Sequence, residues 1–297
     1  MKKLLVSILA VTLVLSCLFA FSACDTEVSA PVSIGVQAGT TGEAYVKGDV
    51  DWGFAGISNS KVSSYENIAL AINDIKNGNI SYAVVDKVVA EEQVKSNSNL
   101  IKYIPVDLTV EKYAIGVDKN NATLLASINT IINRIKNDGT LDAIYDAYGS
   151  IEISDDESTG SVPAESTGYT GITNGNSSAE NKLIVATNAA FAPYEYKVGD
   201  KFYGIDMEIA KIIATELNLE LVINDMDFSA VVTSVQQGLA DVAIACLTVN
   251  AVREQSVTFS VAYEEGAAQV LIVKKDDTAF DNCKTAADVD AVFKNMK

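Results

Sequence analysis

Two successive strand–helix–strand patterns between residues 182 and 275 constrain the fold of this chain most strongly. Leu183–Thr187 is a short apolar run, rich in β-branched residues, that is typical of a buried parallel strand. Apolar residues recur at helical spacing after Gly204, and Leu219–Ile223 returns to strand character. A second helix and the apolar strand DVAIACL follow within residues 228–247. This alternation predicts an α/β fold with a largely parallel sheet.

Residues that follow the predicted strands form a first group of candidate site residues. In an open α/β sheet, the loops at the strand ends project into a common crevice, where ligands bind. We therefore expect five side chains to face one cavity, namely Asn188, Phe191, Phe228, Cys246 and Thr248.

The first part of the chain shows the same alternation. Val32–Val36 is a predicted strand that ends at Gln37, and the turn GTTG follows at residues 39–42. Such a turn can present backbone N–H groups to an anion, although a simple tight turn has the same composition. Further helices are predicted over Ala69–Ile75, Val88–Lys95, Leu124–Ile135 and Leu141–Tyr148, and further strands over Tyr82–Val85, Leu100–Ile104 and Tyr113–Val117.

Asp86 lies between a predicted strand and a predicted helix, and two roles are open for it. Its side chain is suited to the N-cap of the helix that follows. The same carboxylate stands at a strand end, where it would face the cavity and bind a cationic group.

The composition excludes several functions. With 39 acidic and 22 basic residues, the formal charge of −17 gives a surface that repels nucleic-acid phosphates. The absence of histidine excludes Ser-His-Asp and Cys-His catalysis. Beyond residue 24 only Cys246 and Cys283 remain, so we expect no metal site and no cofactor, and a disulfide between the two is left open.

The first 24 residues have the pattern of an export signal. Two lysines precede an apolar run, and small residues and a sharp change to polar sequence follow it. The stretch Phe21–Cys24 resembles a bacterial lipobox, which implies a lipid on Cys24 and an extracytoplasmic, membrane-anchored protein. Cys17 is a rival lipidation site, and an ordinary signal or an uncleaved anchor is the alternative.

Residues 151–181 differ from the rest of the chain. Ser, Thr, Gly, Asp and Glu dominate, and there is no lysine or arginine. Because such a segment buries too little apolar surface to offset its ordering entropy, we expect a flexible linker.

Several segments resemble one family, the polar amino-acid solute-binding proteins of ABC importers (bacterial solute-binding proteins, family 3). Those that resemble its first lobe are TNAAFAPYEY (187–196), YGIDMEIA (203–210), MDFSAVVTSVQQGLADVAIA (226–245) and TVNAVREQSVTFSVAY (248–263). KNDGTLDAIYDAYG (136–149) resembles the last segment of such proteins, yet it lies in the middle of this chain.

The resemblance implies a circularly permuted type II periplasmic-binding fold, an α/β architecture of two Rossmann-like lobes joined by a two-segment hinge. A fusion of two half-domains from different binding proteins is the alternative. In the permuted order, the first lobe is 118–150 plus 182–268, the second lobe is 31–112 plus 277–297, the hinge strands are 113–117 and 269–273, and the linker is 151–181.

The resemblance also implies a binding site for a free amino acid that is passed to a membrane permease without chemistry. Arg253 and Thr248 would hold the α-carboxylate, and Thr41 of the GTTG turn would close on the same group. Asp86 and the carbonyl of Cys246 would hold the α-ammonium. Cys246 stands where family members often have glycine or serine, which leaves the pocket shape open.

The side chain of the ligand would lie between Phe191 and Phe228, with Asn188 and Gln37 at its polar end. These uncharged amides favour a neutral polar amino acid.

Other interpretations stay open. Arg253 could form a surface ion pair with Glu254, and Phe191 and Phe228 could be ordinary core residues. An exported dehydratase on the same scaffold would use Asp86 or Glu195 for acid–base work. A tethered sensor module is the third class.

Overall fold

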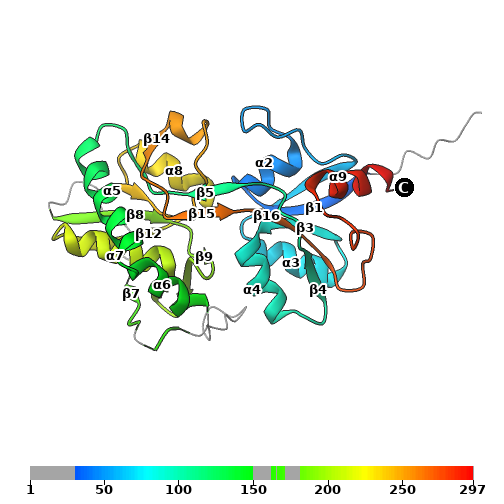
Figure 1. Ribbon diagram of the computed structural model, residues 1–297, viewed down its shortest axis with the longest axis horizontal. Coiled ribbons are helices and arrows are strands. Elements are labelled where there is room, and N and C mark those ends of the chain that lie inside the picture. The colour runs from blue at the N-terminus through cyan, green and yellow to red at the C-terminus, as the bar shows by residue number, and fades with distance from the viewer. Residues whose placement is uncertain (1–30, 150–161, 165, 171–180, 297) are drawn as a thin grey trace, which may run out of the picture. The chain divides into compact units, whose positions relative to one another are not determined.

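The computed structural model describes residues 31–149, 162–164, 166–170 and 181–296 (Figure 1). The predicted signal segment, with Cys17 and Cys24, lies outside these residues. Residues 31–295 form one compact unit. Among the described residues, no helix combines the length and the hydropathy that a membrane crossing requires.

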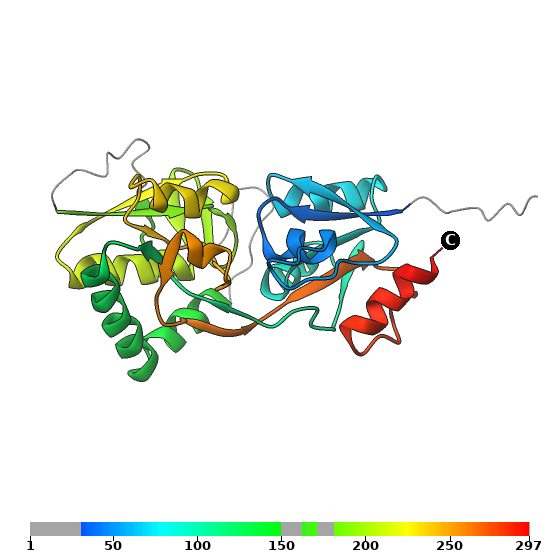
Figure 2. The same ribbon diagram turned by 90° about the horizontal axis from the view of Figure 1, so that it is seen from above.

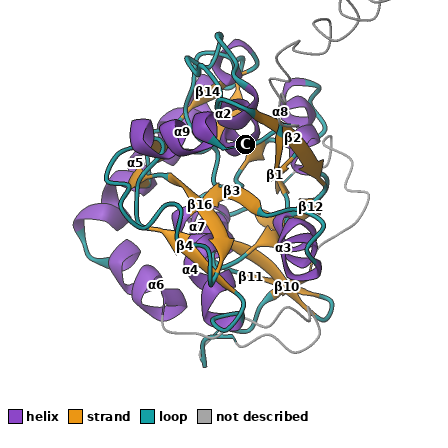
Figure 3. Cartoon of the chain, turned by 90° about the vertical axis from the view of Figure 1, so that its right-hand side faces the viewer, coloured by secondary structure: helices purple, strands orange, loops and turns teal. Residues whose placement is uncertain are grey.

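Sheet I has five strands in the order β2-β1-β3-β16-β4 (Figure 3). β1 runs parallel to β2 and β3, whereas β16 is antiparallel to both of its neighbours. The strands are β1 (Val32–Gln37), β2 (Ser60–Tyr65), β3 (Tyr82–Asp86), β4 (Ile101–Ile104) and β16 (Gln269–Lys274). The accompanying helices are α2 (Thr41–Lys47), α3 (Ile68–Asn77), α4 (Lys87–Ser96) and α9 (Ala286–Asn295).

Local sequence signals account for these helices. In α3, the side chain of Asn67 accepts a hydrogen bond from the N–H of Leu70, and Gly78 ends the helix in the left-handed conformation. The face that packs on sheet I is apolar and consists of Ile68, Ala71, Ile72 and Ile75.

The helix α9 contacts the segment before β2 and the start of β3, and Figure 2 shows it beside the part of the chain that contains sheet I. The carboxylate of Asp290 in α9 accepts a hydrogen bond of 2.6 Å from the N–H of Ser58, and the ring of Phe293 lies 5.1 Å from that of Tyr82. Sheet I is therefore completed by segments from both ends of the described chain.

Sheet II has five strands in the order β12-β8-β13-β6-β14. β8 is parallel to β12 and β13, whereas β6 is antiparallel to β13 and β14. The strands are β6 (Gly116–Asp118), β8 (Lys182–Thr187), β12 (Glu220–Asp225), β13 (Val242–Ala243) and β14 (Val257–Phe259). The helices are α5 (Ala122–Asn137), α6 (Thr140–Gly149), α7 (Ile205–Glu216), α8 (Phe228–Gln236) and the 3-10 turn η1 (Arg253–Gln255).

The predicted apolar strand DVAIACL is much shorter than expected. Only Val242 and Ala243 pair with β8 and β6. The backbone then bends, and Cys246 adopts a left-handed conformation with φ of 47°. Burial of the whole segment explains its apolar sequence, because burial does not require strand geometry.

The chain passes between the two sheets at a short antiparallel pair, β5 (Glu111–Tyr113) and β15 (Glu264–Ala267). The predicted strand Tyr113–Val117 is thus divided between β5 and β6, which belong to different sheets. Gln269–Val273, expected to cross between the lobes, lies inside β16 of sheet I. Apolar strand sequence does not indicate which sheet a strand joins.

The described part of the expected flexible linker is ordered against sheet II. β7 (Tyr169–Thr170) pairs with β11 (Lys201–Tyr203), in a small sheet with β10 (Glu195–Val198) and β9 (Ala190–Phe191). The carboxylate of Glu208 in α7 accepts hydrogen bonds from the hydroxyls of Tyr148, Ser166 and Tyr169, at 3.0, 3.1 and 2.7 Å.

We predict that the hydrogen bonds from these three hydroxyls to Glu208 contribute measurably to the stability of the fold. Replacing Tyr169 by Phe removes one hydrogen bond to the Glu208 carboxylate and should lower the free energy of unfolding by about 1–2 kcal/mol. Urea titration of the variant, beside Tyr45→Phe in α2 as the control, measures this. Equal stability of Tyr169→Phe and wild type would show that the hydrogen bond from Tyr169 to Glu208 does not stabilise the folded state.

Candidate functional site

One small pocket gathers residues from the end of β1 to the start of α2 and from the end of β3, together with residues of β9, α8, η1 and the loop after β13. Its lining consists of Gln37, Thr40, Thr41, Asp86, Phe191, Phe228, Ala245, Cys246, Thr248 and Arg253. Eight of the nine predicted site residues are among them. The ninth, Asn188, lies directly behind, because its Oδ1 accepts a hydrogen bond of 2.8 Å from Gln37 Nε2.

Arg253 is buried, with 6% of its surface exposed. Its Nη1 donates to the carbonyl of Thr248 at 3.0 Å, and its Nη2 donates to the carbonyl of Gly39 at 3.2 Å. Within the described chain, no carboxylate lies within 4.0 Å of the guanidinium, and Glu254 is exposed. The surface ion pair considered from the sequence is therefore absent from the described part. Burial lowers the pKa of Arg253 to about 10.

The GTTG turn lies close to Arg253 because Gly39 permits the approach. Gly39 has φ of 78°, and a Cβ there would lie 3.1 Å from the backbone of Ser229 in α8. Thr40 then caps α2 by accepting a hydrogen bond from the N–H of Glu43. A larger residue at position 39 would hold the turn away from Arg253.

A chain of hydroxyls runs from Thr41 to a buried carboxylate. Thr41 Oγ1 donates to Thr248 Oγ1 at 2.9 Å, and Thr248 Oγ1 donates to Glu111 Oε2 at 2.5 Å. Thr109 donates to the other oxygen of Glu111, which is 3% exposed. Thr248 therefore connects the buried Glu111 carboxylate to the pocket, and the carbonyl of the same residue accepts a hydrogen bond from the Arg253 guanidinium.

Asp86 is the carboxylate in the pocket itself. It occupies the N-cap position of α4, but its side chain makes no capping hydrogen bond; instead it accepts one from the hydroxyl of Tyr113. Burial, reinforced by the charge of Glu111, raises the pKa of Asp86 to about 7. A cationic group brought beside Asp86 would favour its charged form.

Both phenylalanines that were expected to enclose the ligand side chain line the pocket. Phe191 is 7% exposed, and the ring of Phe228 lies 5.3 Å from the Arg253 guanidinium. Trp52, which the sequence reasoning missed, approaches the same guanidinium at 5.0 Å. Because Trp52 is the only tryptophan, composition alone could have drawn attention to it.

The amides are linked to each other. Asn188 Nδ2 donates to the carbonyl of Met226 at 2.8 Å, so both polar atoms of this side chain are used. Gln37 Oε1 is buried and has no hydrogen-bond partner within the described chain. The pocket therefore offers an acceptor that suits a donor group on a ligand.

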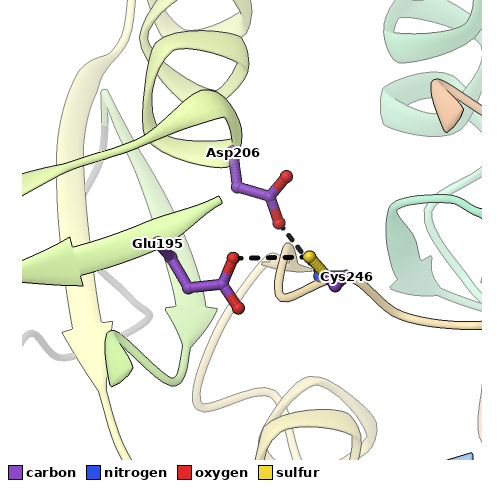
Figure 4. Close-up of side chains that lie close together, drawn as sticks. All are labelled: Glu195, Asp206 and Cys246. Carbon is purple, nitrogen blue, oxygen red and sulfur yellow. Dashed lines mark hydrogen bonds between the residues drawn. The ribbon is translucent and has the colours of Figure 1, made fainter. Parts of the chain in front are cut away.

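Beneath the pocket lies a buried cluster that the sequence did not predict (Figure 4). Glu195, Asp206 and the thiol of Cys246 offer oxygen and sulfur atoms within 4.8 Å of one another. Asp206 Oδ2 accepts from the N–H of Cys246 at 3.0 Å and from the hydroxyl of Tyr263 at 3.1 Å. The Cys246 Sγ lies 3.7 Å from Glu195 Oε2.

Burial shifts the titration of all three groups in this cluster. Burial, together with the charge of Asp206, raises the pKa of Glu195 well above its ordinary value, and burial raises the pKa of Asp206 to about 6. Burial also raises the pKa of the Cys246 thiol, so a divalent ion would have to displace protons from this site. Hydrogen bonds within the cluster account for its geometry, and we assign it no metal.

The match to a known protein family concerns the second part of the chain. The family model of the bacterial extracellular solute-binding proteins, family 3, matches residues 183–297. The similarity to that family covers these residues, which are less than half of the chain. In this solute-binding segment lie Phe191, Phe228, Thr248 and Arg253, whereas Gln37, Thr41 and Asp86 come from outside it.

Curated relatives match over similar lengths. The arginine-binding extracellular protein ArtP of Bacillus subtilis is 34% identical over 110 residues, which is 37% of this chain and 42% of that protein. A probable histidine-binding protein of Neisseria gonorrhoeae is 29% identical over 117 residues, 39% of this chain and 42% of that protein. The chain thus spans about two fifths of the length of these relatives.

Among solved structures, the arginine-bound form of domain 1 from TmArgBP is 28% identical, with a TM-score of 0.28. The match covers 39% of this chain and 94% of that structure.

The raised carboxyl pKa values predict how stability depends on pH. A carboxyl whose pKa is higher in the folded state binds protons preferentially there, so its contribution to stability is lost as the pH rises. For Asp86 this loss of stability is expected between pH 3.8, the ordinary pKa of the group, and about pH 7, its pKa in the folded protein. We expect the melting temperature to fall over this window, and to fall less in Asp86→Asn. Thermal scans in matched buffers measure this, with Asp142→Asn at an exposed position as the control. Parallel profiles for all three proteins would contradict it.

Proposed function

We propose that the solute-binding segment and the first part of the chain together bind a free amino acid for delivery to an ABC permease. The observation that carries this proposal is the buried Arg253 guanidinium, which no carboxylate of the described chain neutralises and which lines the same pocket as Asp86. An α-carboxylate at the first and an α-ammonium at the second would neutralise both.

The carboxylate would meet several donors. A guanidinium forms two parallel hydrogen bonds with a carboxylate, which the single ammonium of lysine does not reproduce. Thr41 and Thr248 bring hydroxyls from the two sheets to the same place. Thr41 and Thr248 now bond to each other, and so do Gln37 and Asn188. A bound ligand would replace both of these hydrogen bonds with bonds to itself.

For the ligand side chain, the free acceptor of Gln37 favours a hydrogen-bond donor. A neutral polar amino acid such as glutamine supplies one, as expected from the two amides. A cationic side chain is the second candidate, because Asp206 and Glu195 lie beneath Cys246 and because the relatives are named as binding arginine and histidine.

The proposal includes the permuted order of the lobes, with the two crossings at β5 and β15 as the hinge. It is supported by the position of α6 and β8, which flank residues 150–180 and both pack with the elements of sheet II. A ligand held by residues of both sheets would favour the closed arrangement only by its higher affinity for it.

Export and lipid attachment at Cys24 are part of the same proposal, and the name of the matched family, extracellular solute-binding proteins, agrees with them. An enzyme of the dehydratase type remains the alternative, and turnover of a cyclic acid would reveal it.

The test is a calorimetric titration of the protein with each of the twenty common L-amino acids. We expect micromolar or tighter binding of at least one with a donor-bearing side chain. Arg253→Lys should weaken it by about 100-fold, since a buried charge pair loses its bidentate geometry. Arg134→Lys is the matched control, because Arg134 is the only other arginine and is exposed. Binding of none by a folded protein would refute amino-acid transport.

The affinity should also depend on pH. Because Asp86 has a pKa of about 7 in the protein and must be charged to hold an ammonium, binding releases a proton below that pH. Between pH 7 and pH 5 we expect affinity to fall by up to about tenfold per pH unit. Asp86→Asn should bind weakly with a flat profile. A flat profile in the wild-type protein would remove Asp86 from the ammonium site.

A further inference from the structure

Two aromatic rings contact the guanidinium of Arg253. The guanidinium carbon lies 5.0 Å from the ring centre of Trp52 and 5.3 Å from that of Phe228. Trp52 belongs to the turn after α2, whereas Phe228 begins α8 beside sheet II. The two rings thus reach the guanidinium from different elements of the fold.

Aromatic faces stabilise this charge in a particular way. The negative face of an aromatic ring attracts a cation, and the attraction is stronger where the cation is desolvated, as it is here. A carboxylate neighbour would stabilise the charge too, but it would occupy the N–H groups that form bidentate pairs. Aromatic rings accept no such hydrogen bonds in the plane of the guanidinium, so they leave its N–H groups free to bind a carboxylate.

We propose that Trp52 is a positioning residue that, together with Phe228, clamps the Arg253 guanidinium and presents its N–H edge to an incoming carboxylate. The carboxylate rests on the proposed function, whereas the clamp is a property of the protein alone. The two hydrogen bonds to the carbonyls of Thr248 and Gly39 fix the remaining orientation of the group.

The clamp also joins the two parts of the site. Arg253 and Phe228 lie in the family-matched segment, and Trp52 and Gly39 lie outside it. A carboxylate held by Arg253 would therefore depend on the turn after α2 as well as on Thr41. Sequence patterns for the matched segment alone do not reveal this dependence.

Arginine-labelled NMR spectra test the clamp without any ligand. The chain has two arginines, so the spectrum contains one signal from Arg253 and one internal control from exposed Arg134. Ring currents should shift the Arg253 Nε–H proton upfield in the wild-type protein. Trp52→Leu should reverse much of this shift, Trp52→Phe should retain part of it, and Arg134 should not change. An unchanged Arg253 signal in Trp52→Leu would overturn the clamp.

Titration with the twenty L-amino acids then tests the positioning role. For any amino acid that binds the wild-type protein, we expect Trp52→Leu to weaken affinity about 10-fold and Trp52→Phe about threefold or less, with unchanged melting temperatures. Unchanged affinity in Trp52→Leu, with the NMR signal altered, would overturn positioning. If no amino acid binds the wild-type protein, the proposed function and the role toward a carboxylate both fail, while the NMR result still decides the clamp.

Discussion

The burial of a guanidinium without a carboxylate partner in the described chain is the constraint on which the site depends. Desolvation of Arg253 is costly, and its burial is tolerated because two carbonyls accept hydrogen bonds from it and two aromatic rings lie close to it. Glu111 lies nearby, but it accepts a hydrogen bond from Thr248 and forms no direct ion pair with Arg253 in the described chain. The site is thus arranged around a cation that can still accept an anion.

Buried acids complement this cation. Asp86 lies in the pocket, and Glu195 and Asp206 lie below it with the thiol of Cys246. Burial raises the pKa of each of the three carboxyls, so part of this acid is neutral near pH 7. The charge of the pocket and of the cluster beside it therefore depends on pH in this range.

Hydrogen bonds join the two parts of the chain at the pocket. Gln37 with Asn188, Thr41 with Thr248, and Gly39 with Arg253 each pair a residue of the first part with one of the second. The family-matched segment contributes the arginine and the phenylalanines, but Asp86 and Trp52 come from outside it. The pocket of this chain is therefore lined by residues of both parts.

The sequence by itself determined the α/β class, most helices, and the candidate residues that follow strands, because periodicity and strand ends are local properties. It led to Asn188, Thr248, Arg253 and Asp86, which the structure brings together. Only the tertiary structure decided the assignment of β5, β6 and β16 to their sheets, since buried strands look alike in sequence. It also decided the stacking of Trp52 on Arg253 and the contact of Cys246 with Glu195, because these are contacts between residues far apart in the chain.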